Sequence, residues 1–364
     1  MAAANYNASN VSVLLNTCTT DATPPVITPD VSSTLGNNGW YRSDITVSWT
    51  VTDAESTVSN QTGCDTQTVS TDTDGVTFTC SATSLGRTST QSVTVKRDAT
   101  APSISFVSRT PAANANGWNN SNVTVNWSCA DSPSGAVNPT DSKTVATEGL
   151  NQSAIGTCTD NAGNSASDTQ SGINIDTTVP TLAPTVAPNP VLLNGTATAS
   201  GNATDSLSGI ASQSCGAVNT SSVGFKTVTC TATDLAGNTT NANANYQVIY
   251  NFAGFFQPVD NLPTVNLATA GSSIPVKFNL GGNQGLAIFA VGYPASVQIA
   301  CSTGTPTSSI EETATAGGSN LTYDATTGQY KYVWSTNRAW RGTCRRLQVR
   351  FIDGTTYVAN FQFR

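Results

Sequence analysis

Short runs of alternating apolar and polar residues extend along most of the chain, and clusters of Gly, Asn, Asp and Pro separate them. In one run, Ile45, Val47 and Trp49 fall on the same face, because side chains of a strand alternate between two faces. The run 122–127 repeats this pattern and also ends in a tryptophan. Helical periodicity is nearly absent. These features predict an all-β fold built of β-sandwich domains.

A pentapeptide recurs at long, nearly constant intervals. It occupies residues 21–25, 98–102 and 176–180, so that successive copies begin 77 and 78 residues apart. A fixed period of this length indicates one domain repeated several times. Each copy ends in proline, which cannot donate a hydrogen bond within a central strand, so the chain leaves the sheet there while staying extended. We therefore expect short, semi-rigid linkers between domains.

The repeats divide the 364 residues into a short N-terminal segment and four domains. A chain of this length can form three or four small domains. The predicted boundaries are 1–20 for an N-terminal strand or tail, 21–97, 98–175 and 176–250 for repeats 1 to 3, and 251–364 for the C-terminal β domain.

The N-terminal segment 1–20 is too short for a domain, and residues 10–16 have the pattern of a single strand. It can be a frayed tail, or a strand donated to the sheet of a neighbouring molecule. In the second case Cys18 could form an intermolecular disulfide, and the chain could form a homopolymer. Residues 1–5 lack the charged and apolar regions of a signal peptide, so we expect that such a peptide was removed or that the chain is a segment of a longer product.

The chain has nine cysteines and no histidine, and the paired Cys-x-x-Cys spacing of zinc sites is missing. Eight cysteines fall into one pair per domain, which predicts structural disulfides and an oxidising compartment. In the loop-entropy model each disulfide contributes about 3–4 kcal/mol to stability. We predict no catalytic residue, no metal and no cofactor. The predicted pairs are Cys64–Cys80, Cys129–Cys158, Cys215–Cys230 and Cys301–Cys344.

Calcium at the domain junctions is the alternative for the aspartates Asp21, Asp98 and Asp176, which begin the linkers. Ca²⁺ takes six to eight oxygen ligands, usually with several carboxylates, and each linker supplies only one. The acidic turn 160–164 can likewise be a metal loop. It lacks the alternating acids of an EF-hand, so a plain hairpin turn is favoured.

Charged residues make up only 10% of the chain, and the net charge is −7. The acidic balance and the absence of a basic run argue against nucleic acid as a partner. No apolar stretch approaches the length of about 20 residues that a membrane-spanning helix needs. Composition therefore favours a protein that is neither a nucleic-acid binder nor a membrane-spanning one.

Several of these motifs together resemble bacterial Ig-like repeats of secreted surface proteins. They are the Asp-x-Thr-x-Pro linker, the Gly-Trp pair that opens two repeats, and the run Cys-Thr-Asp-x-Ala-Gly-Asn at 158–164. The run Pro-Val-Lys-Phe at 275–278 resembles the PxKF-type domain that often closes such arrays. The two resemblances cover about residues 21–364. They imply an all-β protein of tandem Ig-like β-sandwich domains, as Ig-like repeats 1 to 3, with a C-terminal β-sandwich domain. They also imply a modular extracellular protein without enzymatic activity, and no site residue follows from them.

We expect an extracellular structural protein, secreted or at the cell surface, that acts as a stalk or a self-assembling fibre subunit. Catalysis is disfavoured because a Ser or Cys nucleophile would lack histidine, its commonest base. The alternative is an adhesin or carbohydrate-binding module that contacts a surface glycan. Its candidate aromatics are Tyr330, Tyr332 and Trp334, which share one face of a strand. Trp40 and Trp118 could also form an aromatic platform, although recurring tryptophans usually pack in a core.

Overall fold

The computed structural model describes residues 21–315 and 321–364. Its fold is all-β, with no α-helix in these ranges, and Arg338–Trp340 forms a 3₁₀ turn (η2). The chain divides into two compact units, Met1–Asp176 and Thr177–Arg364. The predicted strand at 1–20, with Cys18, lies outside the described residues. In the part of the chain that is described, no helix is long and apolar enough to cross a bilayer.

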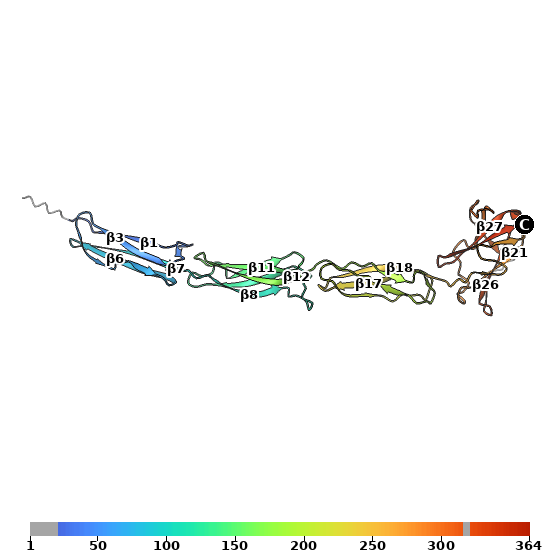
Figure 1. Ribbon diagram of the computed structural model, residues 1–364, viewed down its shortest axis with the longest axis horizontal. Coiled ribbons are helices and arrows are strands. Elements are labelled where there is room, and N and C mark those ends of the chain that lie inside the picture. Colours follow the sequence, from blue (N-terminus) through green and yellow to red (C-terminus); the bar gives the residue numbers. More distant parts are fainter. Residues whose placement is uncertain (1–20, 316–320) are drawn as a thin grey trace, which may run out of the picture. The chain divides into compact units, whose positions relative to one another are not determined.

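The first repeat forms two sheets around a thin core, ordered β1-β3-β5 and β2-β7-β6-β4 (Figure 1). Ile45, Val47 and Val69 from the first sheet pack against Val95 from the second. Trp49, which alternation places on the same face as Ile45, is only partly buried beside this core. The strands are β1 (Val26–Ser32), β2 (Trp40–Tyr41), β3 (Ile45–Thr52), β4 (Val58–Thr62), β5 (Gln67–Val69), β6 (Thr73–Ser84) and β7 (Arg87–Arg97).

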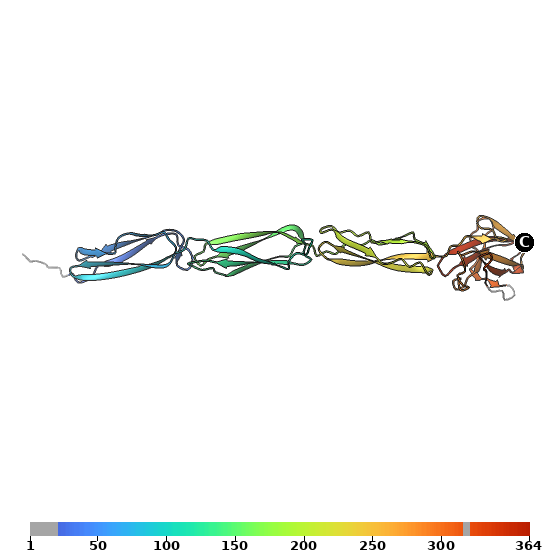
Figure 2. The same cartoon turned by 90° about the horizontal axis from the view of Figure 1, so that it is seen from below.

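The second repeat places a three-stranded sheet, β10-β9-β8, against the hairpin β11-β12. Figures 1 and 2 both show β8, β11 and β12 running alongside one another. Trp127 is fully buried because Gly156 faces it, and a Cβ atom at Gly156 would lie only 2.4 Å from the indole. The indole Nε1 donates a hydrogen bond to Asp168 Oδ2 at 2.7 Å. The strands are β8 (Ser103–Thr110), β9 (Val123–Ala130), β10 (Thr140–Val145), β11 (Gly149–Thr159) and β12 (Ser165–Ile175).

The third repeat has no tryptophan, and smaller side chains fill its core. Val186, Val191, Val228, Tyr246 and Val248 are buried between the pair β13-β15 and the sheet β14-β18-β17-β16. The strands are β13 (Thr185–Ala187), β14 (Val191–Leu192), β15 (Thr198–Ser200), β16 (Ile210–Cys215), β17 (Gly224–Asp234) and β18 (Thr239–Ile249).

The C-terminal domain has the largest core of the described residues, and aromatic rings dominate it. One sheet runs β19-β21-β26-β24, with β25 also on β26, and the other runs β20-β28-β27-β22-β23. The Pro-Val-Lys-Phe motif forms the end of β21, where Val276 and Phe278 are fully buried. The strands are β19 (Phe255–Phe256), β20 (Val265–Ala268), β21 (Ser273–Phe278), β22 (Ala295–Ile299), β23 (Glu311–Glu312), β24 (Ala314–Thr315), β25 (Thr322–Asp324), β26 (Gln329–Ser335), β27 (Cys344–Arg350) and β28 (Thr356–Phe363).

Candidate metal centre at the junction of the first two repeats

Four disulfides form among the described residues, and one of them differs from the rest. Cys129 lies in β9 and Cys158 in β11, so this bond joins the two sheets of the second repeat. The other three stay within one sheet: Cys215–Cys230 joins β16 to β17, while Cys64 and Cys301 lie just beyond β4 and β22 and bond to the neighbouring strands β6 and β27. The four bonds are Cys64–Cys80, Cys129–Cys158, Cys215–Cys230 and Cys301–Cys344.

The expected ligand-binding aromatics lie in the core of the C-terminal domain, which corrects that expectation. Tyr330, Tyr332 and Trp334 are only 0%, 4% and 0% exposed. Alternation had correctly placed the three on one face of β26, but that face packs against the opposite sheet. Trp40 and Trp118 are also buried and offer no platform on the surface.

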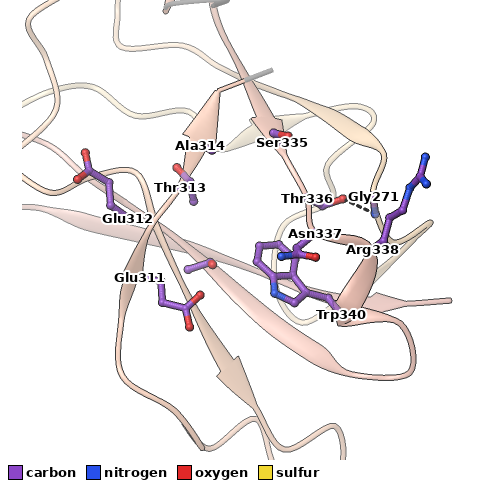
Figure 3. Close-up of a pocket in the computed structure, with 11 residues that line it drawn as sticks. Gly271, Glu311, Glu312, Thr313, Ala314, Ser335, Thr336, Asn337, Arg338 and Trp340 are labelled. Atoms are coloured by element: carbon purple, nitrogen blue, oxygen red, sulfur yellow. Dashed lines mark hydrogen bonds between the residues drawn. The ribbon is translucent and has the colours of Figure 1, made fainter. Parts of the chain in front are cut away.

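A hollow of about 500 Å³ opens beside Trp340 in the C-terminal domain, and Figure 3 shows Glu311 and Trp340 among the residues around it. The Arg345 guanidinium carbon lies 3.9 Å from the centre of the Trp340 ring, so it covers one face of the indole. Arg345 is buried and donates hydrogen bonds to Ser296 Oγ at 3.0 Å and Glu311 Oε2 at 3.1 Å. The arrangement stabilises the sheet edge and leaves this face of Trp340 unavailable to a sugar ring.

Three aspartates from separate segments converge at the start of the second repeat. Asp98 belongs to the linker, Asp131 follows β9, and Asp160 follows β11 at the start of a hairpin turn. One carboxylate oxygen of each lies within 4.8 Å of the others. Asp98 and Asp160 are 0% exposed, and Asp131 is partly exposed. We call Asp98, Asp131 and Asp160 the aspartate cluster.

Two members of the cluster hold the surrounding backbone in place. Asp160 Oδ1 accepts hydrogen bonds from the backbone N–H groups of Gly163 at 2.7 Å and Asn164 at 2.8 Å. Asp160 Oδ2 accepts another from Asn164 Nδ2 at 2.9 Å. Asp98 Oδ2 accepts from the backbone N–H of Ser134 at 3.2 Å. These donors are neutral, so they orient the carboxylates without cancelling their charge.

Asp131 is the member whose bonding is incomplete. Its Oδ2 accepts hydrogen bonds from Ser134 Oγ at 3.1 Å and the backbone N–H of Gly135 at 2.9 Å. Its Oδ1 is buried and has no hydrogen-bond partner. Burial raises the pKa of the Asp131 carboxyl above its ordinary value, and the negative charges of Asp98 and Asp160 raise it further. The cluster therefore disfavours its own full ionisation.

In the first repeat, the side chains equivalent to the aspartate cluster form a similar group with one acid fewer. We call this group, in either repeat, the corner. Asp21 and Asp53 occupy the positions of Asp98 and Asp131, and Ser84 stands where the second repeat has an aspartate. Ser84 Oγ lies 2.8 Å from Asp21 Oδ2 and 2.7 Å from Asp53 Oδ2, within hydrogen-bonding distance of both. The hydrogen bond from Ser84 lowers the pKa of Asp53, and the backbone N–H groups of residues 55 and 56 lower it further. Ser84 and the backbone therefore satisfy Asp53, whereas Asp21 Oδ1 is buried without a hydrogen-bond partner, as Asp131 Oδ1 is in the second repeat.

The turn at Asp160 also forms the contact with the first repeat. Its carbonyl groups accept hydrogen bonds from the loop 36–42 of that repeat. Gly36 has no room for a side chain there, because a Cβ atom would lie 2.3 Å from the Ala162 carbonyl oxygen. The three hydrogen bonds run from Asn37 N to Ala162 O at 2.9 Å, from Asn38 Nδ2 to Asn161 O at 3.0 Å, and from Arg42 Nη1 to Gly163 O at 3.2 Å.

The linker itself is held from the side of the first repeat. Asp72 accepts a hydrogen bond from the backbone N–H of Ala99 at 2.9 Å and pairs with Arg97. The backbone N–H of Asp98 donates to the carbonyl of Tyr41 at 2.9 Å. The linker is therefore hydrogen-bonded along its length, which fits the semi-rigid character predicted from its proline.

The aspartate cluster is the feature that sequence reasoning missed, because the linker acids and the turn acids were considered separately. A signal was present in the spacing of the acids. Asp98, Asp131 and Asp160 are 33 and 29 residues apart, and the third repeat has Asp176, Asp205 and Asp234, spaced by 29 and 29.

Comparisons with known proteins identify no family, since neither a protein family nor a curated protein matches the chain. Among solved structures, the chain is similar to the ICAM-5 D1–D4 ectodomain fragment, with 12% identity, 92% of this chain and 98% of that chain covered, and a TM-score of 0.31. A tetra-tandem repeat in the extending region of a large adhesion protein is 15% identical, with 95% and 93% covered and a TM-score of 0.25. Domains 4–9 of the surface layer protein SbsC are 11% identical, with 93% and 47% covered and a TM-score of 0.19. TM-scores of this size carry no argument, so the fold is taken from the strands of this chain.

Proposed function

We propose that the chain is an extracellular structural protein, a series of disulfide-stapled Ig-like sandwiches that acts as a cell-surface stalk or fibre subunit. The observation that carries this proposal is the hydrogen-bonded junction between the first two repeats. Three hydrogen bonds connect loop 36–42 to the turn 160–164, and the linker is fixed by Asp72. A protein that only presented independent binding domains would not need junctions held in this way.

The disulfides support a secreted or cell-surface location. Each domain has one, and disulfides persist in oxidising compartments. They compensate for thin cores, since the core of the first repeat centres on four buried side chains. The acids in the first repeat and at the Trp340 hollow are bonded to neighbouring side chains. They therefore serve to hold the structure together, which fits a mechanical role. The domain boundaries, the PxKF-type closing domain and polymerisation through residues 1–20 remain predictions.

The proposal is tested by measuring how the first two repeats are held relative to each other in the full chain. Spin labels on exposed positions of each repeat would report the distance distribution by pulsed electron paramagnetic resonance. We expect a narrow distribution for the unaltered protein and a broad one for Gly36→Ala, because the added Cβ collides with the Ala162 carbonyl. Thr34→Ala, an exposed position beside the same loop, is the matched control and should leave the distribution narrow.

A distribution that is already broad in the unaltered protein would contradict a stiff stalk. Negative-stain electron microscopy of the same samples would show whether particles are single rods or filaments, which distinguishes a stalk from a fibre subunit.

A further inference from the structure

The aspartate cluster brings three carboxylates together without a cationic side chain to balance them. The ion pairs among the described residues are Arg97–Asp44, Arg97–Asp72 and Arg345–Glu311, and none includes a member of the cluster. A buried charge without an opposite charge is unfavourable, and two of these three side chains are fully buried. We propose that Asp98, Asp131 and Asp160 bind one Ca²⁺ ion.

The unpartnered oxygen of Asp131 is a second observation that supports a cation. Oδ1 is buried, accepts no hydrogen bond, and belongs to a carboxylate whose other oxygen is already bonded twice. Buried polar atoms are nearly always partnered, and an unpartnered one is explained by strain, a water molecule or an ion. Because the atom is an oxygen of a carboxylate beside two further carboxylates, a hard cation is the ligand that satisfies it.

The geometry and donor set suit Ca²⁺. All donors in the cluster are oxygens, which Ca²⁺ binds at about 2.3–2.6 Å in flexible arrangements of six to eight ligands. Two oxygens on opposite sides of one ion are therefore up to about 5 Å apart. The 4.8 Å limit within the cluster places all three carboxylates within reach of a single ion. The partly exposed side of Asp131 leaves room for water to complete the shell.

Bound Ca²⁺ would act on the junction through Asp160. The carboxylate of Asp160 holds the turn by its bonds to Gly163 and Asn164, and the carbonyls of that turn contact the first repeat. Asp98 is part of the linker itself. An ion bound to both would fix the linker and the turn together, so calcium would stiffen the junction. This consequence, unlike the binding site, rests on the proposed structural function.

The first repeat supplies an internal control. Ser84 replaces the third acid, and Asp53 has both oxygens satisfied, by Ser84 and by the backbone N–H groups of residues 55 and 56. Asp21 Oδ1 is buried without a partner here too, but only two carboxylates meet and Ser84 lies between them, so we expect no calcium in the first repeat. The third repeat has aspartates at the three corresponding sequence positions, so we expect the full chain to bind two ions.

The test is calorimetric titration of CaCl₂ into the full chain after treatment with chelator. We expect the Asp131→Asn variant, which has nearly the same shape, to bind one ion fewer than the unaltered protein. Asp53→Asn, the equivalent change in the first repeat, should bind the full number. Titration with MgCl₂ should give at least tenfold weaker binding.

Absence of binding at millimolar calcium, or equal stoichiometry for the unaltered protein and Asp131→Asn, would overturn the proposal. Circular dichroism and the melting temperature in chelator show whether each variant is folded. If Asp131→Asn does not fold, Asp160→Asn can take its place in the comparison. Its control is Ser84→Ala, which changes the equivalent position of the first repeat. The distance measurement between the first two repeats, with and without calcium, then tests the stiffening separately. Normal binding with an unchanged distance distribution would leave the site in place and contradict only the mechanical role.

Discussion

The first and second repeats place related residues at the same corner, and a single side chain separates their chemistry. In the first repeat, Ser84 lies between Asp21 and Asp53 and lowers the pKa of Asp53 by a hydrogen bond. In the second, a third aspartate takes this position, and the pKa of Asp131 is raised by burial and by its charged neighbours. The comparison shows that a hydroxyl group at this position hydrogen-bonds both neighbouring carboxylates, whereas a third carboxylate adds a negative charge that the proposed cation would balance.

The two repeats also differ in their disulfides. Cys64–Cys80 spans 16 residues within one sheet, and Cys129–Cys158 spans 29 residues and joins two sheets. In the second repeat the disulfide adds a covalent bond to the core and to the Trp127–Asp168 hydrogen bond, which also join the two sheets. In the first repeat the core and side-chain hydrogen bonds join the sheets, and its disulfide does not.

The largest expected effect is the loss of the inter-sheet disulfide. Replacing Cys129 and Cys158 together by serine should lower the free energy of unfolding of the second repeat by about 3–4 kcal/mol. The same change at Cys64 and Cys80 should cost about 3 kcal/mol, because the closed loop is shorter. Chemical denaturation of the full chain, followed by hydrogen exchange resolved to each repeat, measures both. Equal protection of the two sheets without the Cys129–Cys158 bond would contradict the distinction.

Calcium should change the stability of the second repeat and leave the first unchanged. At a concentration 100 times the Kd, one bound ion stabilises the folded state by about 2.7 kcal/mol. In chelator, Asp131→Asn should be more stable than the unaltered protein, because it removes one of three repelling charges. With calcium the order should reverse. Differential scanning calorimetry in the two buffers measures the melting temperatures of both proteins and so detects this reversal of order. An equal rise in melting temperature with calcium for both proteins would argue against it.

Gly156→Ala should destabilise the second repeat by about 1–3 kcal/mol, because the added methyl group overlaps the Trp127 ring. The first repeat has only partly buried Trp49 at the related position, so its core should tolerate small changes better. Thermal melting compares this variant with Ala154→Gly, a cavity-forming change in the same strand. A larger loss of stability for Gly156→Ala would indicate overpacking, and an equal loss would indicate that β11 is sensitive to any substitution.

Ser84→Asp would convert the corner of the first repeat into that of the second. We expect the variant to bind one additional Ca²⁺ ion and to become less stable in chelator, by an amount within about 1–3 kcal/mol. Calorimetric titration provides the stoichiometry, and Ser84→Asn is the uncharged control. An unchanged stoichiometry would show that the single replacement does not account for the difference between the repeats.

The smallest expected difference is in the response to pH without calcium. Because the pKa of Asp53 is lowered by folding, its contribution is present above the ordinary Asp pKa of about 3.9 and is lost as pH falls toward the lowered value. Because the pKa of Asp131 is raised, the second repeat instead loses stability as pH rises from about 3.9 through the raised value. Asp168 in the second repeat and Asp72 in the first also have lowered pKa values, so each contribution is isolated by comparison with a variant. The change in stability between the unaltered protein and Asp53→Asn, and that between the unaltered protein and Asp131→Asn, should depend on pH with opposite signs.

Much of the fold was predictable from the alternation of apolar and polar residues and from the spacing of the cysteines. The period of two places Val47 and Val125 in their cores, and the recurring linker indicates repeated domains. Alternation identifies a shared face and leaves open which face is buried, so Tyr330 and Trp334 were candidates for ligand contact although both lie in the core. It also could not foresee that Trp49 is less buried than Trp127, since that depends on the space left by Gly156.

The candidate site was less accessible to sequence reasoning because its members are far apart in the chain. Each of Asp98, Asp131 and Asp160 looks like an ordinary turn or linker residue by itself. Only the folding of β9 and β11 against the linker brings their oxygens within 4.8 Å. Aligning the acids of successive repeats would have indicated the cluster, although not the burial that makes it unbalanced.

The bond between Cys129 and Cys158 also limits how far the second repeat can extend under tension. Cys129 and Cys158 are 29 residues apart in the sequence, and the segment between them cannot be pulled straight while the bond is intact. At roughly 3.5 Å per extended residue, this withholds about 100 Å of contour length from a pulling force. A reducing agent would release that length, so redox conditions would set the extensibility of the chain.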